Sequence, residues 1–206
     1  DLCLDYSAFT WDPEFDIEEI ENPDTFFTFA IDLAEGVGRD HTVINMFKVE
    51  AMDDKDIDRL NSPGSLIDLF RLTQVGVFRS NLHNLEDFSK ILYTLCVKFF
   101  DQENLRLIIE YNTYGSELIK NLVTLYPNSN DFDEETIVRY HHRVGARTKS
   151  PGIRINKDNK VLYCEKLKNL ISNGQLILKD KRTISEARMF SRNSNGTYSA
   201  QSGNDD

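Results

Sequence analysis

The sequence predicts an α/β domain in which helices flank a mixed central sheet. Three strand-like segments come first, at 26–33, 41–50 and 70–79, and a helix, a fourth strand and a second helix follow them. An acidic residue stands at the end of two of these strands, Asp32 in the first and Glu110 in the fourth. A carboxylate at the end of a buried strand is costly unless a cation holds it, so both positions are candidates for function.

The N-terminal residues 1–25 show no apolar periodicity, and we expect an arm or linker anchored by Trp11 and Phe15. We assign residues 26–206 to one domain, because 206 residues with 40% hydrophobic content supply one core and nothing repeats at a fixed period. The chain begins inside an acidic segment without a Met, which leads us to expect part of a larger protein.

The first half of the domain alternates between strand and helix patterns. The segment 51–69 is polar and contains Pro-Gly, which predicts an inserted hairpin or loop between the second and third strands. Apolar residues spaced for one helix face run from Leu85 to Phe99. A second helix, with Leu118 and Leu122 on its apolar face, follows the strand that ends at Glu110.

The last third is less regular. The pattern predicts a helix over 161–172, a short edge strand at 176–178 and another helix over 183–190. Thr183 with Glu186 three residues later has the spacing of a capping box, which predicts that Thr183 begins the last helix. The residues beyond Ser191 are rich in turn formers.

Composition sets further bounds. No apolar run reaches the length of a transmembrane helix, and no apolar signal segment follows a basic stretch, so we expect a soluble domain with no membrane partner. The three cysteines, Cys3, Cys96 and Cys164, are far apart in the sequence, which is typical of free thiols in a reducing compartment.

The two acidic strand ends have a structural and a functional interpretation. Strand-terminal carboxylates are common as helix caps or solvated loop starts. However, Glu35 and Asp40 follow Asp32 closely, and two intervening glycines permit a tight turn that would crowd these carboxylates. Hard cations such as Mg²⁺ take oxygen ligands and relieve such crowding. The same two glycines do not form a dinucleotide-binding motif, because the required third glycine is missing.

A basic segment contrasts with the net charge of −10. Between 139 and 160 there are seven Lys or Arg residues and only one Asp, which indicates either a site for a polyanion or a solvated loop. None of the four histidines pairs with a plausible nucleophile, so the sequence favours metal chemistry over a catalytic triad.

Several motifs together resemble a known family. They are Asp32-Leu-Ala-Glu35-Gly-Val-Gly-Arg-Asp40, Gln74-Val-Gly-Val77, Glu110-Tyr-Asn112-Thr-Tyr-Gly115 and the closing Asn204-Asp205-Asp206. From about residue 26 to the end, the chain resembles the C-terminal nuclease domain of the terminase large subunit of tailed phages of the T-even type. The resemblance implies an RNase H-like (RuvC- and integrase-type) fold, the mixed sheet flanked by helices.

The resemblance also implies a metal centre. Its catalytic, metal-binding triad would be Asp32, Glu110 and Asp206, with Asp205 as the alternative third ligand and Asp40 as a further ligand. Glu35 and Asn112 would support these ligands from behind. Two Mg²⁺ ions would be bound in each active site, and Mn²⁺ could substitute for them.

The function implied is that of a metal-dependent endonuclease which cuts concatemeric viral DNA during packaging by two-metal phosphodiester hydrolysis. Its partners would be double-stranded DNA, an N-terminal ATPase domain of the same polypeptide, the portal protein and the small terminase subunit. It would act in the host cytoplasm, transiently docked on the prohead. The residues expected to contact DNA are Arg143, Arg147, Thr148, Lys149, Arg154 and Lys157. Two alternatives remain: another RNase H-like nuclease such as a Holliday-junction resolvase, and a DNA-guiding docking module with cutting suppressed.

Overall fold

A computed structural model describes residues 9–34, 40–53, 55, 69–99, 104–124, 139–140, 151–194 and 196–200 of the chain. Its central sheet is built from β1 (Thr10–Trp11), β2 (Phe26–Asp32), β3 (Thr42–Ala51), β4 (Phe70–Ser80), β5 (Leu105–Ile109) and β8 (Leu176–Ile177). The strand order is β1-β4-β3-β2-β5, and β8 pairs with β4 as well.

The sheet is mixed. Strands β2, β3 and β4 form an antiparallel meander, and β5 then lies parallel to β2 on its other side. Parallel neighbours need a crossover connection, which α2 (Leu85–Phe99) supplies between β4 and β5. The predicted fold class is therefore confirmed: a meander, a helix and a fourth strand parallel to the first make a mixed sheet flanked by helices, as the RNase H-like resemblance implied.

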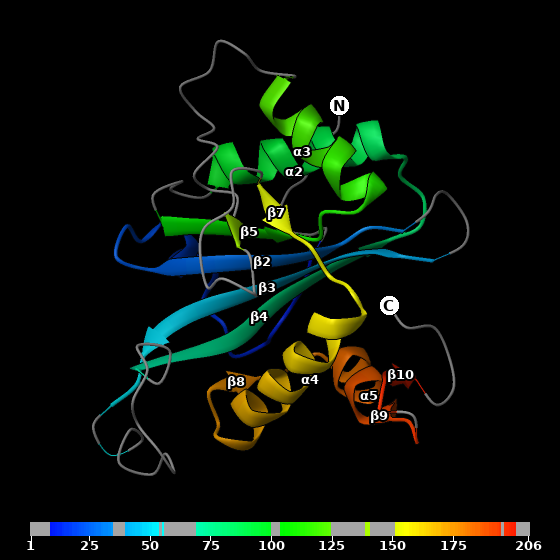
Figure 1. The fold of residues 1–206 in the computed structure, drawn as a ribbon. Coiled ribbons are helices and arrows are strands. Elements are labelled where there is room, and N and C mark those ends of the chain that lie inside the picture. The colour runs from blue at the N-terminus through cyan, green and yellow to red at the C-terminus, as the bar shows by residue number, and fades with distance from the viewer. Residues whose placement is uncertain are drawn as a thin grey trace.

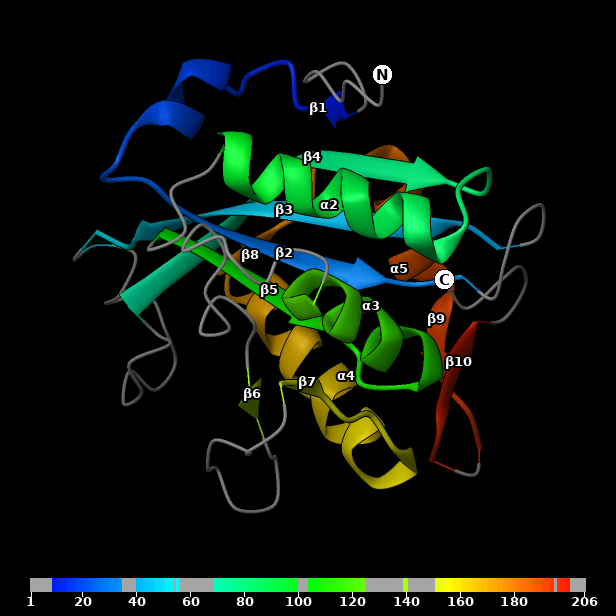
Figure 2. The same ribbon diagram turned by 90° about the horizontal axis from the view of Figure 1, so that it is seen from above.

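Helices cover both faces of this sheet (Figure 1). Helices α2 and α3 (Thr113–Thr124) lie side by side on one face, and α4 (Lys157–Ser172) and α5 (Lys181–Met189) lie on the other. In the view from above, α2 runs beside β3 and β4, while α3 lies near the end of β5 (Figure 2). We refer to these two sides as the α2/α3 face and the α4 face.

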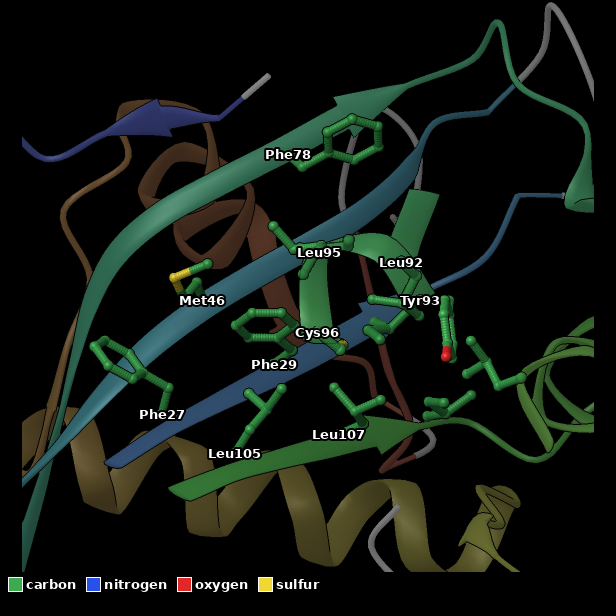
Figure 3. Packing of buried hydrophobic residues seen from close by; sticks show 14 of the residues in the cluster. Phe27, Phe29, Met46, Phe78, Leu92, Tyr93, Leu95, Cys96, Leu105 and Leu107 are labelled. Atoms are coloured by element: carbon green, nitrogen blue, oxygen red, sulfur yellow. The ribbon is translucent and has the colours of Figure 1, made fainter. Parts of the chain in front are cut away.

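The main core lies on the α2/α3 face. Side chains alternate along a strand, so Phe27, Phe29 and Ile31 of β2 all point to this face and are buried there. Figure 3 shows strand residues meeting Leu92, Leu95 and Cys96 of α2. Burial raises the pKa of the Cys96 thiol, so this cysteine is a core residue and no nucleophile.

The segment expected to be an arm or linker lies against the sheet from residue 9 onward. Strand β1 pairs with the outer edge of β4, and a 3₁₀ helix, η2 (Ile17–Glu21), follows it. Trp11 stacks on Phe15 with 5.6 Å between ring centroids, and both pack against the core. A large apolar surface on each of these residues is thereby removed from water.

The start of the last helix corrects one prediction. Helix α5 begins at Lys181 and its N-cap is Asp180, whose carboxylate accepts the backbone N–H of Thr183 at 2.7 Å. Thr183 is thus not the cap, and Glu186 bonds to Arg182 at 2.8 Å instead of closing a capping box. The aspartate is favoured because Arg79 also donates to its carboxylate, at 2.8 Å.

Two small two-stranded sheets, one parallel and one antiparallel, complete the described elements. One pairs β6 (Arg139–Tyr140) with β7 (Gly152–Ile153), and the other pairs β9 (Phe190–Arg192) with β10 (Tyr198–Ala200). The predicted insertion at 51–69 lies mostly outside the described residues. Of the helices in the described ranges, none is long and apolar enough to cross a membrane.

Candidate metal centre at the end of two parallel strands

The register of the sheet places Asp32 and Glu110 next to each other. Strands β2 and β5 pair in parallel with Ile31 opposite Ile109, so the following residues end two adjacent strands. Neighbouring strands are about 4.8 Å apart. Because Ile31 and Ile109 point into the core, Asp32 and Glu110 point to the α4 face.

A cavity of about 570 Å³ lies at this point between the sheet and α4. Its polar lining is contributed by Asp32, Asn45, Glu110, Lys160, Tyr163 and Cys164. The rest of its wall is apolar and includes Ile108 and Ile153. Ile155 and Leu167 at its rim are 44% and 46% exposed, so the cavity opens to solvent along α4.

The charges in this cavity are unbalanced. Partial burial raises the pKa of Glu110, the negative charge of Asp32 raises it further, and the ammonium group of Lys160 lowers it in part. Burial and the neighbouring carboxylate both disfavour the charged form of Glu110, so added positive charge here would stabilise the ionised pair. Two carboxylates in this state suit a divalent cation, which takes oxygen ligands and neutralises both.

The motif Glu110-x-Asn112-x-x-Gly115 places helix α3 directly behind Glu110. The side-chain oxygen of Asn112 accepts the backbone N–H of Gly115 at 2.9 Å, which caps the first turn of α3. A Cβ atom on Gly115 would lie 1.8 Å from the backbone oxygen of Glu110, so only glycine fits there. Both residues thus hold the backbone of the acidic strand end against the helix.

Helix α4 brings Lys160, Tyr163 and Cys164 to the cavity. Its first turn is held by two asparagines, because Asn156 and Asn159 each accept the other's backbone N–H, at 3.0 Å and 2.7 Å. The buried side chain of Asn159 also donates to the Arg154 carbonyl at 2.6 Å. This capping starts the helix at Lys157, four residues before the predicted start, and fixes which α4 residues face the sheet.

The other predicted site residues fall into two groups. Asp40 is described and half-buried, but it does not line the cavity. Within the described ranges no three His, Cys, Asp or Glu residues gather closely enough to hold a metal, so Asp32 and Glu110 form a pair there. The predictions for Glu35, Asp205, Asp206, Arg143, Arg147, Thr148 and Lys149 lie outside the described residues.

Two predicted DNA contacts can be placed beside the cavity. Arg154 is exposed, and its guanidinium group lies 4.5 Å from the ring centre of Tyr111. Lys157 is exposed at the first residue of α4. Arg154 stands between the cavity-lining residues Ile153 and Ile155, and Lys157 stands between Ile155 and the cavity-lining Lys160.

Four polar residues of the cavity were missed as site residues by the sequence reasoning: Asn45, Lys160, Tyr163 and Cys164. Two signals were available: Lys160 belongs to the basic segment 139–160, and Asn45 is a polar residue between the apolar Ile44 and Met46 of a strand.

Comparisons with known proteins give structural likeness alone. No family model matches the sequence, and no curated protein matches it. Two solved structures that it resembles are both large terminase nucleases of the thermophilic phage G20c. The first has a TM-score of 0.47 and 14% identity over 88% of this chain and 76% of that one. The second, with bound cobalt, has a TM-score of 0.49 and 14% identity over 89% and 76%.

Proposed function

We propose that this chain is the metal-dependent DNA endonuclease domain of a phage terminase large subunit, which cuts concatemeric viral DNA during genome packaging. The observation that carries the proposal is a pair of carboxylates, Asp32 and Glu110, at the ends of adjacent parallel strands and lining one cavity. Oxygen ligands gathered in this way suit divalent cations, which serve phosphodiester hydrolysis in nucleases.

Asp32 and Glu110 would hold two Mg²⁺ ions, or Mn²⁺ in their place, and Asp206 or Asp205 would complete the triad. Asp40 would add a further ligand, and Glu35 and Asn112 would support the ligands. When bound, such ions activate a water molecule and stabilise the leaving oxygen. The positive charge of Lys160 partly offsets the burial and the Asp32 charge that raise the pKa of Glu110, and so favours the ionised form that binds a cation.

The substrate in this proposal is double-stranded DNA, which meets the basic segment beside the cavity. Arg154 and Lys157 offer exposed cations there, and we propose that Arg143, Arg147, Thr148 and Lys149 extend the same surface. Such contacts position the duplex and do not read its sequence. The further partners in the proposal are an ATPase domain of the same polypeptide, the portal protein and the small terminase subunit, on a prohead in the host cytoplasm.

The decisive experiment combines cleavage with cation binding. We expect Asp32→Asn and Glu110→Gln each to abolish cutting of plasmid DNA in Mg²⁺ or Mn²⁺ and to weaken Mn²⁺ binding in calorimetry. The matched control is Glu117→Gln, an exposed carboxylate on α3 away from the cavity, which should cut as the wild type does. Thermal unfolding checks that each variant is folded, and the apo form of each site variant should be no less stable, because a like charge has been removed.

Three results would count against the proposal. Cutting that persists in excess chelator would exclude metal chemistry. Cutting by a folded Asp32→Asn or Glu110→Gln variant would exclude this pair as the ligands. A wild-type protein that binds DNA and Mn²⁺ but never cuts would instead favour the DNA-guiding module.

A further inference from the structure

A buried glutamine on β4 has only one possible orientation. The side chain of Gln74 is 1% exposed, and its oxygen Oε1 accepts the backbone N–H groups of Lys179 and Asp180, each at 2.9 Å. Two N–H donors can face only an oxygen, so the amide cannot be turned around. The amide nitrogen Nε2 must therefore point the other way, toward β3.

The orientation of Gln74 fixes that of Asn45. Nε2 of Gln74 donates to Oδ1 of Asn45 at 2.8 Å. The hydroxyl of Thr183 also lies 3.5 Å from Oδ1, although its shorter bond, 2.9 Å, goes to the Asp180 carboxylate. Since the oxygen of Asn45 is held by the donor of Gln74, its amino group Nδ2 must face away from this network.

The amino group of Asn45 is presented to the cavity. Asn45 lies on the α4 face opposite Ala30, lines the cavity together with Asp32 and Glu110, and is half-buried. Within the described ranges Nδ2 has no hydrogen-bond partner, while Oδ1 has two contacts. The backbone thus orients Gln74, Gln74 orients Asn45, and the cavity receives two N–H donors.

We propose that Asn45 binds a phosphate oxygen of the DNA strand held at the acidic pair, and that Gln74 is its positioning residue. This inference rests on the proposed function. Asp32 is two residues along β2 from Ala30, the cross-strand partner of Asn45, so it is a diagonal neighbour of Asn45. Diagonal neighbours are about 7–8 Å apart, which is within reach of an amide and a phosphate group together.

A phosphate oxygen matches the Nδ2 donor of Asn45 better than a sugar or base of the DNA strand does. Cations held by Asp32 and Glu110 would draw phosphate groups to this end of the cavity, and the non-reacting phosphate oxygens can accept hydrogen bonds from neutral amides. The wall between the acids and Asn45 is made of Ala30, whose small side chain leaves the space open.

The test uses Asn45→Asp, which keeps the acceptor that Gln74 needs and replaces the donor with an anionic oxygen. Single-turnover cutting in Mn²⁺ is measured over a range of enzyme concentrations on three duplexes of unrelated sequence. We expect the half-saturating concentration to rise roughly 10- to 100-fold, as for loss of a hydrogen bond to a charged group. The rise should be equal for all three duplexes, and the saturated rate should stay within about twofold, because binding has changed and the reacting atoms have not.

Two further variants test the orientation of Asn45 and control for the added charge. Gln74→Glu leaves Asn45 in place but offers it an acceptor, so the Asn45 amide must turn and its N–H groups leave the cavity. Gln74→Glu should therefore also raise the half-saturating enzyme concentration, as Asn45→Asp does. Asn22→Asp makes the same charge change at a surface turn whose oxygen accepts the Asp24 N–H, and it should behave as the wild type does.

The outcomes are distinct. If the wild type cuts DNA and Asn45→Asp binds as tightly, the inference fails while the proposed function stands. A loss that differs among the duplexes would mean that Asn45 contacts a base and not a phosphate. A lower saturated rate together with weaker Mn²⁺ binding would mean that Asn45 acts on the acidic pair. If the wild type neither binds nor cuts DNA, the proposed function and this inference both fall.

Discussion

Replacing Gly115 with alanine sets two effects of opposite sign against each other. Gly115 is the third residue of α3, and alanine has the higher helix propensity, so substitution in an open helix would stabilise the fold by up to about 1 kcal/mol. The added Cβ, however, would lie 1.8 Å from the backbone oxygen of Glu110 and 3.0 Å from its carbonyl carbon.

The steric effect decides the sign. Real Cβ atoms essentially never approach a neighbour within 3.0 Å, so α3 and β5 would have to separate by at least about 1.2 Å, the difference between 3.0 Å and 1.8 Å, in a close-packed core. The obstructing atom belongs to the backbone, so no side chain can turn aside. Overpacking of this kind costs about 1–3 kcal/mol or more, and we expect net destabilisation of about 2 kcal/mol.

Urea unfolding followed by circular dichroism measures this change as a lower midpoint at constant slope. The control is Gly174→Ala, where φ is +69° and a Cβ would meet nothing within 4 Å, so only the left-handed conformation costs energy, about 1 kcal/mol. A Gly115→Ala protein as stable as the wild type would refute the close approach of α3 to the end of β5. The separation should also shift Glu110, so Mn²⁺ binding should weaken in Gly115→Ala and stay unchanged in Gly174→Ala.

Two further predictions concern charge. Burial alone would raise the pKa of Asp180, but hydrogen bonds from Arg79 and Thr183 outweigh burial and lower that pKa. The ionised Asp180 therefore stabilises the folded state above the unfolded-state pKa of about 4, and this stabilisation is lost as pH falls through the folded-state pKa. The unfolding free energy of Asp180→Asn should accordingly be lower at neutral pH and depend less on pH below about pH 4; an unchanged acid limb would contradict the role of this cap. If Lys157 contacts a DNA phosphate, Lys157→Ala should weaken binding to any duplex and flatten the plot of log affinity against log salt by about 0.9, whereas Lys120→Ala on α3 should leave the slope unchanged.

The strands and helices that the sequence predicts well are those whose patterns come from burial on one face. Strands β2 to β5 and helices α2 and α3 pack on the main core, so their apolar residues repeat with the period of the element. Helix α4 has a weaker pattern, because one side faces a partly open cavity and Leu162 and Leu167 are exposed. Its predicted start was therefore late by one turn, and only the paired asparagines at its N-terminus reveal the true one.

Some residues of the candidate site could likewise be predicted from the sequence, and others could not. The placement of Asp32 beside Glu110 could be expected, because both end short buried strands and parallel strands bring such ends together. Asn45 could not be recognised, since its orientation depends on Gln74 and, through it, on the backbone at Lys179, more than 100 residues away. The capping of α5 by Asp180 was missed for a similar reason, because Arg79 on a distant strand selects the aspartate. The metal-binding roles of Asp32, Glu110, Asp205 and Asp206 stay predictions.

The apolar residues of the core, and not the acids themselves, hold the acidic pair together. On β2, Phe27, Phe29 and Ile31 are buried on the α2/α3 face, which leaves Asp32 on the α4 face. A slip of one residue would exchange the faces and expose three large side chains, each worth about 1.5–3 kcal/mol of burial. Two carboxylates about 5 Å apart repel by roughly 3 kcal/mol at an effective dielectric constant of 20, and by less where water reaches the exposed Asp32. The core term is larger, so the register survives the repulsion and keeps Asp32 and Glu110 side by side at the ends of β2 and β5.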